Sequence, residues 1–166
     1  MRESGAVRII TTGGTIDKVY FDATSEYEVG ESHIPEILRE SNVTAEWAVT
    51  NLMRKDSLDL TDEDRATIRR AVEAAGENHI VVTHGTDTMV QTARALTGLP
   101  DKTIVLTGSL HPARFKTTDA VFNVAAAFTA AQALPPGVYV AMNGRIFRPD
   151  RVRKNRERNR FEEPEA

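Results

Sequence analysis

Two short loops of this sequence place threonine hydroxyl groups beside glycines, a combination suited to attack on a carbonyl group. Residues 12–15 read TGGT, and residues 83–88 read THGTDT. Glycine lets the backbone turn sharply and come close to a ligand, and a threonine hydroxyl becomes a nucleophile when a neighbouring group assists it. Side by side, two such loops could attack a carbonyl carbon and hold the resulting oxyanion with main-chain N–H groups.

Each loop also has a purely structural interpretation. A Gly-Gly pair after a strand is often a tight turn, and threonine is a common helix cap, so either loop alone is more often structural than catalytic. Neither loop matches the G-x-G-x-x-G or G-x-x-x-x-G-K-[ST] phosphate patterns. The four histidines show no metal-ligand spacing, and His84 is better explained as a structural hydrogen-bonding residue than as a base. We therefore predict no metal and no cofactor.

The elements that must position these loops alternate between strands and helices. Short apolar runs predict buried strands at 7–12, 80–83, 103–107 and 138–142, and 43–53 is strand-like. Helices are predicted at about 32–40, 61–75, 87–96 and 119–133, with Thr61 as a cap, whereas 15–30 lacks a clear period and is predicted to be a loop. This pattern predicts a three-layer α/β/α fold with a mostly parallel sheet. Loops that follow its strands should gather along one rim.

Composition limits the broad class of protein. The 166 residues, with 40% hydrophobic and 27% charged side chains, suit one domain over residues 1–166 with a full core. A net charge of −3 argues against a general nucleic-acid binder. The chain contains no cysteine, which excludes disulfides and a thiolate nucleophile. No apolar run approaches the length of a membrane span, and the first apolar stretch is too short for a signal-peptide core. A cytoplasmic protein is expected.

Residues 12–17 (TGGTID) and 83–92 (THGTDTMVQT) resemble the two signature motifs of the bacterial-type L-asparaginases. The similarity continues in order along nearly all of the chain, through residues 25–30, 56–57, 105–112, 142–143 and 152–155. It implies the flavodoxin-like fold of the asparaginase N-terminal domain. It also implies an amidohydrolase that converts L-asparagine to L-aspartate and ammonia.

The resemblance also implies roles for individual residues. Thr15 matches the nucleophile that forms a covalent acyl-enzyme, and Tyr27, on a mobile loop, matches the residue that assists its deprotonation. Thr86, Asp87 and Lys154 match a second triad, and the N–H groups of Thr15 and Thr86 match the oxyanion donors. Among these, Asp87 would also bind the α-ammonium of the substrate. The substrate-binding positions implied in full are Gly14, Ser57, Leu58, Gly85, Thr86 and Asp87.

Each of these roles has a simpler alternative. Tyr27 could be a surface aromatic of its loop, Ser57 a turn residue and Asp87 a helix cap. Lys154 lies in RVRKNRERNR (151–160), and a basic run of this kind is usually solvated surface. We expect this segment to be mostly exposed, with Lys154 alone turned inward.

The chain departs from the family pattern in two ways. It resembles only the N-terminal domain, so nothing maps onto the acidic residue that a neighbouring subunit's C-terminal domain supplies in longer members. A residue of a second copy, from about 145–160, could replace it, and a homodimer or homotetramer is expected. Leu58 stands where many members carry glutamine, which hydrogen-bonds the ligand. Fewer polar anchors should penalise the longer substrate glutamine, so weak or no glutaminase activity is predicted.

Three other functions stay open at this point. The chain could be a broader asparaginase-glutaminase. It could be the amide-cleaving subunit of a tRNA amidotransferase, although a chain of this length is too short to add a tRNA-binding region. It could also be a catalytically silent domain that binds aspartate or asparagine, which the presence of all the expected catalytic residues disfavours.

Overall fold

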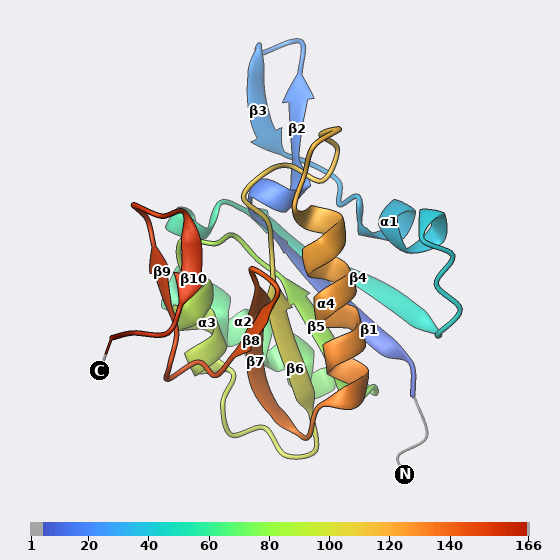
Figure 1. Cartoon of the computed structure of the whole chain (residues 1–166). Helices are drawn as coiled ribbons and strands as arrows, with labels where there is room; N and C mark the ends of the chain where they lie inside the picture. The colour runs from blue at the N-terminus through green and yellow to red at the C-terminus, as the bar shows by residue number, and fades with distance from the viewer. Residues whose placement is uncertain (1–4, 166) are drawn as a thin grey trace.

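The computed structural model describes residues 5–165, and a six-stranded sheet forms its centre (Figure 1). The strand order is β4-β1-β5-β6-β7-β8, with five parallel strands and an antiparallel β8. The strands are β1 (Val7–Gly13), β4 (Trp47–Lys55), β5 (His79–Thr83), β6 (Thr103–Thr107), β7 (Gly137–Met142) and β8 (Arg145–Phe147). In chain order the parallel strands run 2-1-3-4-5 across the sheet, which is the flavodoxin-like order.

Helices cover both faces of the sheet. On one face lie α1 (Ile34–Glu40) and α4 (Ala120–Ala133), and on the other α2 (Asp62–Ala74) and α3 (Met89–Ala95). Neighbouring strand residues divide between the two layers, because successive side chains point to opposite faces. Ile9 packs under α1 and α4, while Ile10 packs under α2 and α3. The predicted three-layer α/β/α fold is confirmed.

The N-terminal ends of helices α2 and α3 differ from each other in how far the sequence predicted them. The Thr61 hydroxyl accepts a hydrogen bond from the Asp64 N–H, and the Asp64 carboxylate accepts one from the Thr61 N–H. This reciprocal cap confirms the predicted start of α2. Helix α3, by contrast, begins at Met89 after an N-terminal cap position at Thr88, not at Asp87. Asp87 therefore stays in the loop between β5 and α3.

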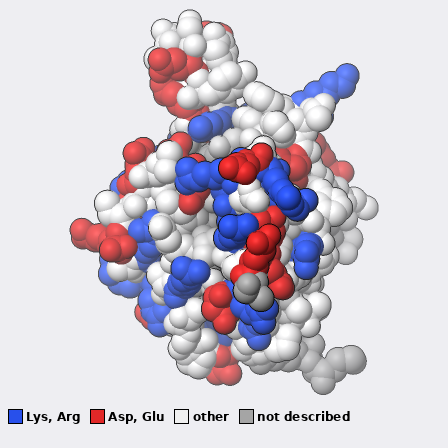
Figure 2. Space-filling view, turned by 60° about the vertical axis from the view of Figure 1, so that its left-hand side comes forward, with Lys and Arg blue, Asp and Glu red and all other residues white. Residues whose placement is uncertain are grey.

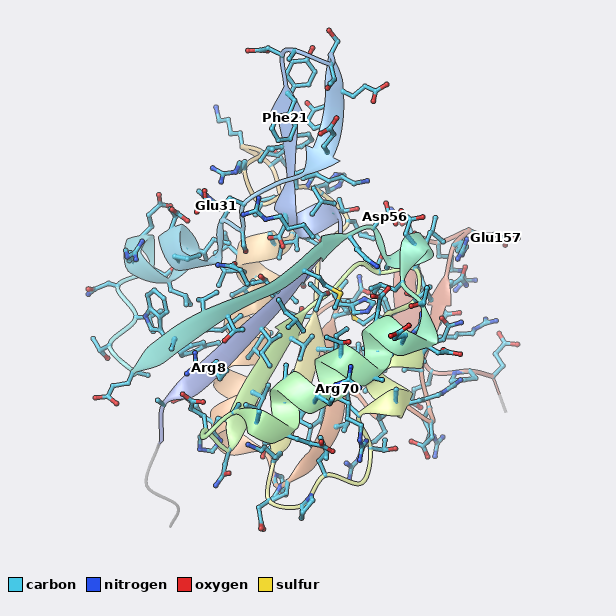
Figure 3. The ribbon with its side chains drawn as sticks, turned by 180° about the vertical axis from the view of Figure 1, so that it is seen from behind. Arg8, Phe21, Glu31, Asp56, Arg70 and Glu157 are labelled. Carbon is cyan, nitrogen blue, oxygen red and sulfur yellow. The ribbon has the colours of Figure 1, made fainter. Side chains whose placement is uncertain are left out.

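The prediction of a loop at 15–30 was wrong. After the 3-10 turn η1 (Thr15–Asp17), strands β2 (Lys18–Phe21) and β3 (Glu26–Val29) form an antiparallel hairpin. The hairpin projects from the body of the molecule, and Phe21 lies on it (Figures 1 and 3). Its strands are mostly exposed, so they lack the alternation of apolar and polar residues that identifies a half-buried strand.

A second small hairpin ends the described chain. It pairs β9 (Arg153–Asn155) with β10 (Arg160–Glu162), neither of which is indicated by the basic run. Val152 and Phe161, each 2% exposed, anchor it against the core beside α3. The arginines of the run are exposed, as expected, while Lys154 is half-buried. Between residues 5 and 165, no helix is both long and apolar enough to span a bilayer.

Candidate active site

The two Gly-Thr loops meet at the point where the sheet changes direction of winding. They follow β1 and β5, which are neighbours in the sheet. Chain connections leave these two strands toward opposite sides, and open α/β sheets bind ligands in the crevice at such a point. The Thr12 hydroxyl donates to the Thr83 carbonyl at 2.7 Å, which ties the two loops at their base.

Gly14 and Gly85 bring these loops into direct contact. Gly14 has a φ of 84°, in the left-handed region that favours glycine, and a Cβ there would collide with the Gly85 main chain. A Cβ on Gly85 would lie 2.6 Å from the Ser57 hydroxyl oxygen. The loops after β1, β4 and β5 therefore pack closely only because both positions lack a side chain.

Lys154 reaches into the second loop from the C-terminal hairpin. Its ammonium donates to the Thr86 hydroxyl and to Asp87 Oδ1, both at 2.9 Å. The Lys154 side chain is 15% exposed and that of Asp87 28%. Arg156 Nη2 lies 3.4 Å from the same Asp87 oxygen. The structure thus brings Lys154 to Thr86 and Asp87, which lie 68 and 67 positions earlier in the sequence. It also adds Arg156, which the sequence did not indicate.

Ser57 lies at the base of this cluster, in the 3-10 turn η2 (Ser57–Asp59). It is 2% exposed, and its carbonyl accepts a hydrogen bond from the Thr88 hydroxyl at 2.7 Å. Leu58 lies beside it in sequence but is 64% exposed. The structure therefore places Ser57 against Gly85 and turns Leu58 toward solvent.

Tyr27 is not placed against Thr15. It lies on the projecting hairpin, 53% exposed, with its ring centroid 5.3 Å from that of Tyr20 and 5.6 Å from that of Phe115. Among residues 5–165, no hydrogen bond joins its hydroxyl to Thr15. Direct action of Tyr27 on Thr15 would therefore need a rearrangement of the Tyr27 side chain or of the hairpin.

His84 belongs to the second loop and has no exposed surface. Nδ1 is 2.6 Å from the Gly85 carbonyl and Nε2 is 2.7 Å from the Thr92 hydroxyl, which also accepts from Arg65 Nε at 3.2 Å. Because a carbonyl only accepts, Nδ1 carries the proton and Nε2 accepts from Thr92. Burial lowers the pKa of His84 to about 4. A neutral ring with both nitrogens bonded holds the Gly85 carbonyl, consistent with a structural role.

Asp17 is a second residue that the sequence did not single out. It is 4% exposed, in the 3-10 turn that begins with Thr15, and its Oδ1 has no hydrogen-bond partner within the described chain. Burial raises the pKa of Asp17 to about 6, although the Ser32 hydroxyl and the guanidinium groups of Arg114 and Arg54 oppose the rise. The TGGTID motif ends at Asp17 but indicates no role for it, because its burial depends on chain segments far from it in sequence.

Residues 6–165 match the family model described as "Asparaginase, N-terminal". The chain belongs to the asparaginase family. The L-asparaginase of Thermococcus kodakarensis is 34% identical over 154 residues, covering 88% of this chain and 46% of that protein. The solved structure of that thermostable L-asparaginase superposes with a TM-score of 0.82 at 31% identity, covering 95% of this chain and 51% of the other.

Two further relatives of this chain carry names other than L-asparaginase. A glutamyl-tRNA(Gln) amidotransferase subunit of Aeropyrum pernix is 37% identical, covering 83% of this chain and 35% of that protein. Glutaminase-asparaginase of Acinetobacter glutaminasificans is 31% identical, covering 85% and 47%. The chain thus spans about a third to a half of the length of these relatives. Its length therefore does not exclude an amidotransferase subunit, contrary to the expectation from the sequence.

In residues 5–165 no group of three or more histidines and carboxylates is arranged to hold a metal ion.

Proposed function

We propose that this asparaginase-family chain hydrolyses the side-chain amide of L-asparagine, with Thr15 as the nucleophile. The observation that carries the proposal is the Lys154–Thr86–Asp87 cluster, with both bonds at 2.9 Å. This cluster follows Gly85, which packs against Gly14, the residue before Thr15. The proposed nucleophile and the Thr86–Asp87 part of the proposed acid–base group are on adjoining loops, an arrangement that supports acyl transfer.

The proposed reaction proceeds in two steps. In the first, the Thr15 hydroxyl oxygen attacks the amide carbon while its proton is removed with the help of Tyr27. Collapse of the tetrahedral intermediate breaks the C–N bond and releases ammonia, which leaves with that proton. In the second step, water attacks the ester, restoring the hydroxyl and giving L-aspartate. The N–H groups of Thr15 and Thr86 would stabilise the oxyanion in both steps.

Lys154 has a distinct part in this proposal. An ammonium group has three donors and no acceptor, so both of its bonds run from Nζ. The Thr86 oxygen is thereby occupied as an acceptor, and its own O–H is left to donate to substrate or water. Lys154 must give up a proton before it can activate that water. Ser57 would receive the substrate α-carboxylate, and Asp87 its α-ammonium.

The decisive experiment measures ammonia release from L-asparagine by the purified chain. Thr15→Ala removes the proposed nucleophile and should lower kcat at least about 10³-fold. Thr129→Ala is the matched control, because that exposed hydroxyl only bonds the main chain of α4. It should keep full activity. Activity that survives in Thr15→Ala would overturn the mechanism, and a wild-type chain that binds aspartate without turnover would indicate a silent binding domain.

The same assay with L-glutamine tests substrate preference. Because exposed Leu58 supplies no hydrogen bond to an amide ligand, we expect kcat/KM to be lower for glutamine than for asparagine. Equal values would indicate a broader asparaginase-glutaminase.

The 37% identity to an amidotransferase subunit supports one further candidate. A subunit of that kind would depend on another protein, so ammonia release by the isolated chain argues against it. A homodimer or homotetramer, a cytoplasmic location and the lack of a nucleic-acid partner also stay predictions.

A further inference from the structure

Two positive groups converge on the single oxygen Asp87 Oδ1. Lys154 Nζ lies 2.9 Å from it and Arg156 Nη2 lies 3.4 Å from it. Among the ion pairs of residues 5–165, Asp87 is the one carboxylate that contacts either cation. One negative charge therefore faces two positive charges, which leaves a local positive excess where the α-ammonium of asparagine would bind.

The two cations differ in how firmly they are held. Lys154 lies on β9, 15% exposed, and also bonds Thr86. The Arg156 side chain is 67% exposed, in the turn between β9 and β10. Figure 2 shows the exposed face on which basic and acidic side chains of this hairpin region lie interleaved. Arg156 can therefore leave Asp87 and turn to an incoming group at little cost.

The main chain on either side of Arg156 is held in place, although the Arg156 side chain is mostly exposed. Asn155 donates to Glu162 across the hairpin at 2.8 Å, and Phe161, 2% exposed, anchors the opposite strand. The Phe161 N–H also bonds the Asn143 side chain at 2.7 Å. A guanidinium on a fixed stem stays within reach of the site and can bind a carboxylate through two parallel N–H bonds.

We propose that Arg156 is a specificity residue that favours substrates with a carboxylate and no neighbouring ammonium. An α-ammonium must compete with Arg156 for Asp87 and is repelled by it, whereas a carboxylate is attracted. Beside L-asparagine, the site should therefore accept the monoamide of a short dicarboxylic acid without a charged amine, such as succinamate. The inference rests on the proposed function, because it uses the amide site formed around Thr15 and Asp87.

Equilibrium binding tests this inference without relying on turnover. Dissociation constants are measured by calorimetry at pH 7 for succinate, which lacks the ammonium, and for L-aspartate. In Arg156→Gln the preference for succinate over aspartate should fall about 3- to 10-fold, the range expected for an exposed ion pair acting oppositely on the two ligands. Arg156→Lys keeps the charge and should retain most of the preference.

Arg158→Gln is the matched control. It removes the same charge from the same exposed turn, and among the described ion pairs none involves the Arg158 side chain. Its succinate-to-aspartate ratio should equal that of the wild type. An unchanged ratio in Arg156→Gln, an equal change in Arg158→Gln, or failure of both ligands to bind at millimolar concentration would each overturn the inference.

Ammonia release separates this inference from the proposed function. The wild type could bind both ligands, with a ratio of dissociation constants that depends on Arg156, and still release no ammonia from asparagine or succinamate. In that case the proposed function fails and the anion preference stands. If asparagine is hydrolysed while the ratio is independent of Arg156, the function stands and the inference fails.

Discussion

At the scale of single residues, the buried carboxyl of Asp17 should make stability depend on pH. Burial raises its pKa from 3.8 to about 6, so the folded protein favours the protonated form. The resulting stabilisation is complete below the unfolded-state pKa and is lost as the pH rises through about 6. At pH 7 the chain is therefore less stable than a version without this charge.

The variant Asp17→Asn tests the predicted direction of this pH dependence of stability. Relative to wild type, its free energy of unfolding should rise between pH 4 and pH 7 by up to about 2–3 kcal/mol, as measured by denaturant unfolding at several pH values. Asp150→Asn removes an exposed carboxylate and should show no such trend. A difference that shrinks with rising pH would show that Asp17 is instead stabilised in its charged form.

The sequence motifs identified some residues of the candidate site and missed others. The motifs named Thr86, Asp87 and Lys154, which the fold brings within 2.9 Å contacts. They gave no role to Asp17, although it ends the TGGTID motif, and none to Arg156, because burial and a shared oxygen depend on chain segments that come together only in the tertiary structure. The inward position of Lys154 followed from the resemblance, since the surrounding basic run by itself indicates solvated surface.

At the scale of elements, the hairpin of β2 and β3 decides how Tyr27 reaches Thr15. Tyr27 and Tyr20 face each other across the hairpin, each about half exposed. If the Tyr27 hydroxyl assists deprotonation, Tyr27→Phe should lower kcat by about 10²- to 10⁴-fold, the range for a positioned acid–base group. The melting temperature should not change, because the ring is retained.

Tyr20→Phe provides the control for that experiment. It removes a hydroxyl from the paired position of the same hairpin and should leave kcat within a factor of about two, because surface changes of this kind have small effects. Full activity in Tyr27→Phe, or an equal loss in Tyr20→Phe, would exclude a specific role for the Tyr27 hydroxyl.

The helices and strands also differed in how well the sequence predicted their presence and their bounds. The bounds of β6 agree with the predicted 103–107, because a strand buried on both faces forms a continuous apolar run. Helix α2 is marked by its cap. The hairpins of β2–β3 and β9–β10 were missed, because their short exposed strands are held by main-chain hydrogen bonds that leave little signal in side-chain type.

At the scale of the whole molecule, the site joins segments from distant parts of the chain. Thr15 follows β1, Ser57 follows β4, Asp87 follows β5 and Lys154 lies on β9. The rim was predictable, because parallel strands end at a common edge. A ligand held by all of these segments binds the folded state alone, so its binding energy adds to the stability of the entire fold.

L-Aspartate should therefore raise the melting temperature of the chain. At a concentration about 100 times its dissociation constant, the stabilisation is about 2.7 kcal/mol, which corresponds to a rise of roughly 5–10 °C for a domain of this size. Asp87→Asn removes the charge that Lys154 and Arg156 share and should abolish most of the shift at the same concentration. Thr129→Ala, on α4, should retain it. An equal shift in Asp87→Asn would place aspartate away from this rim, because a ligand can stabilise the fold only through contacts that the variant still makes.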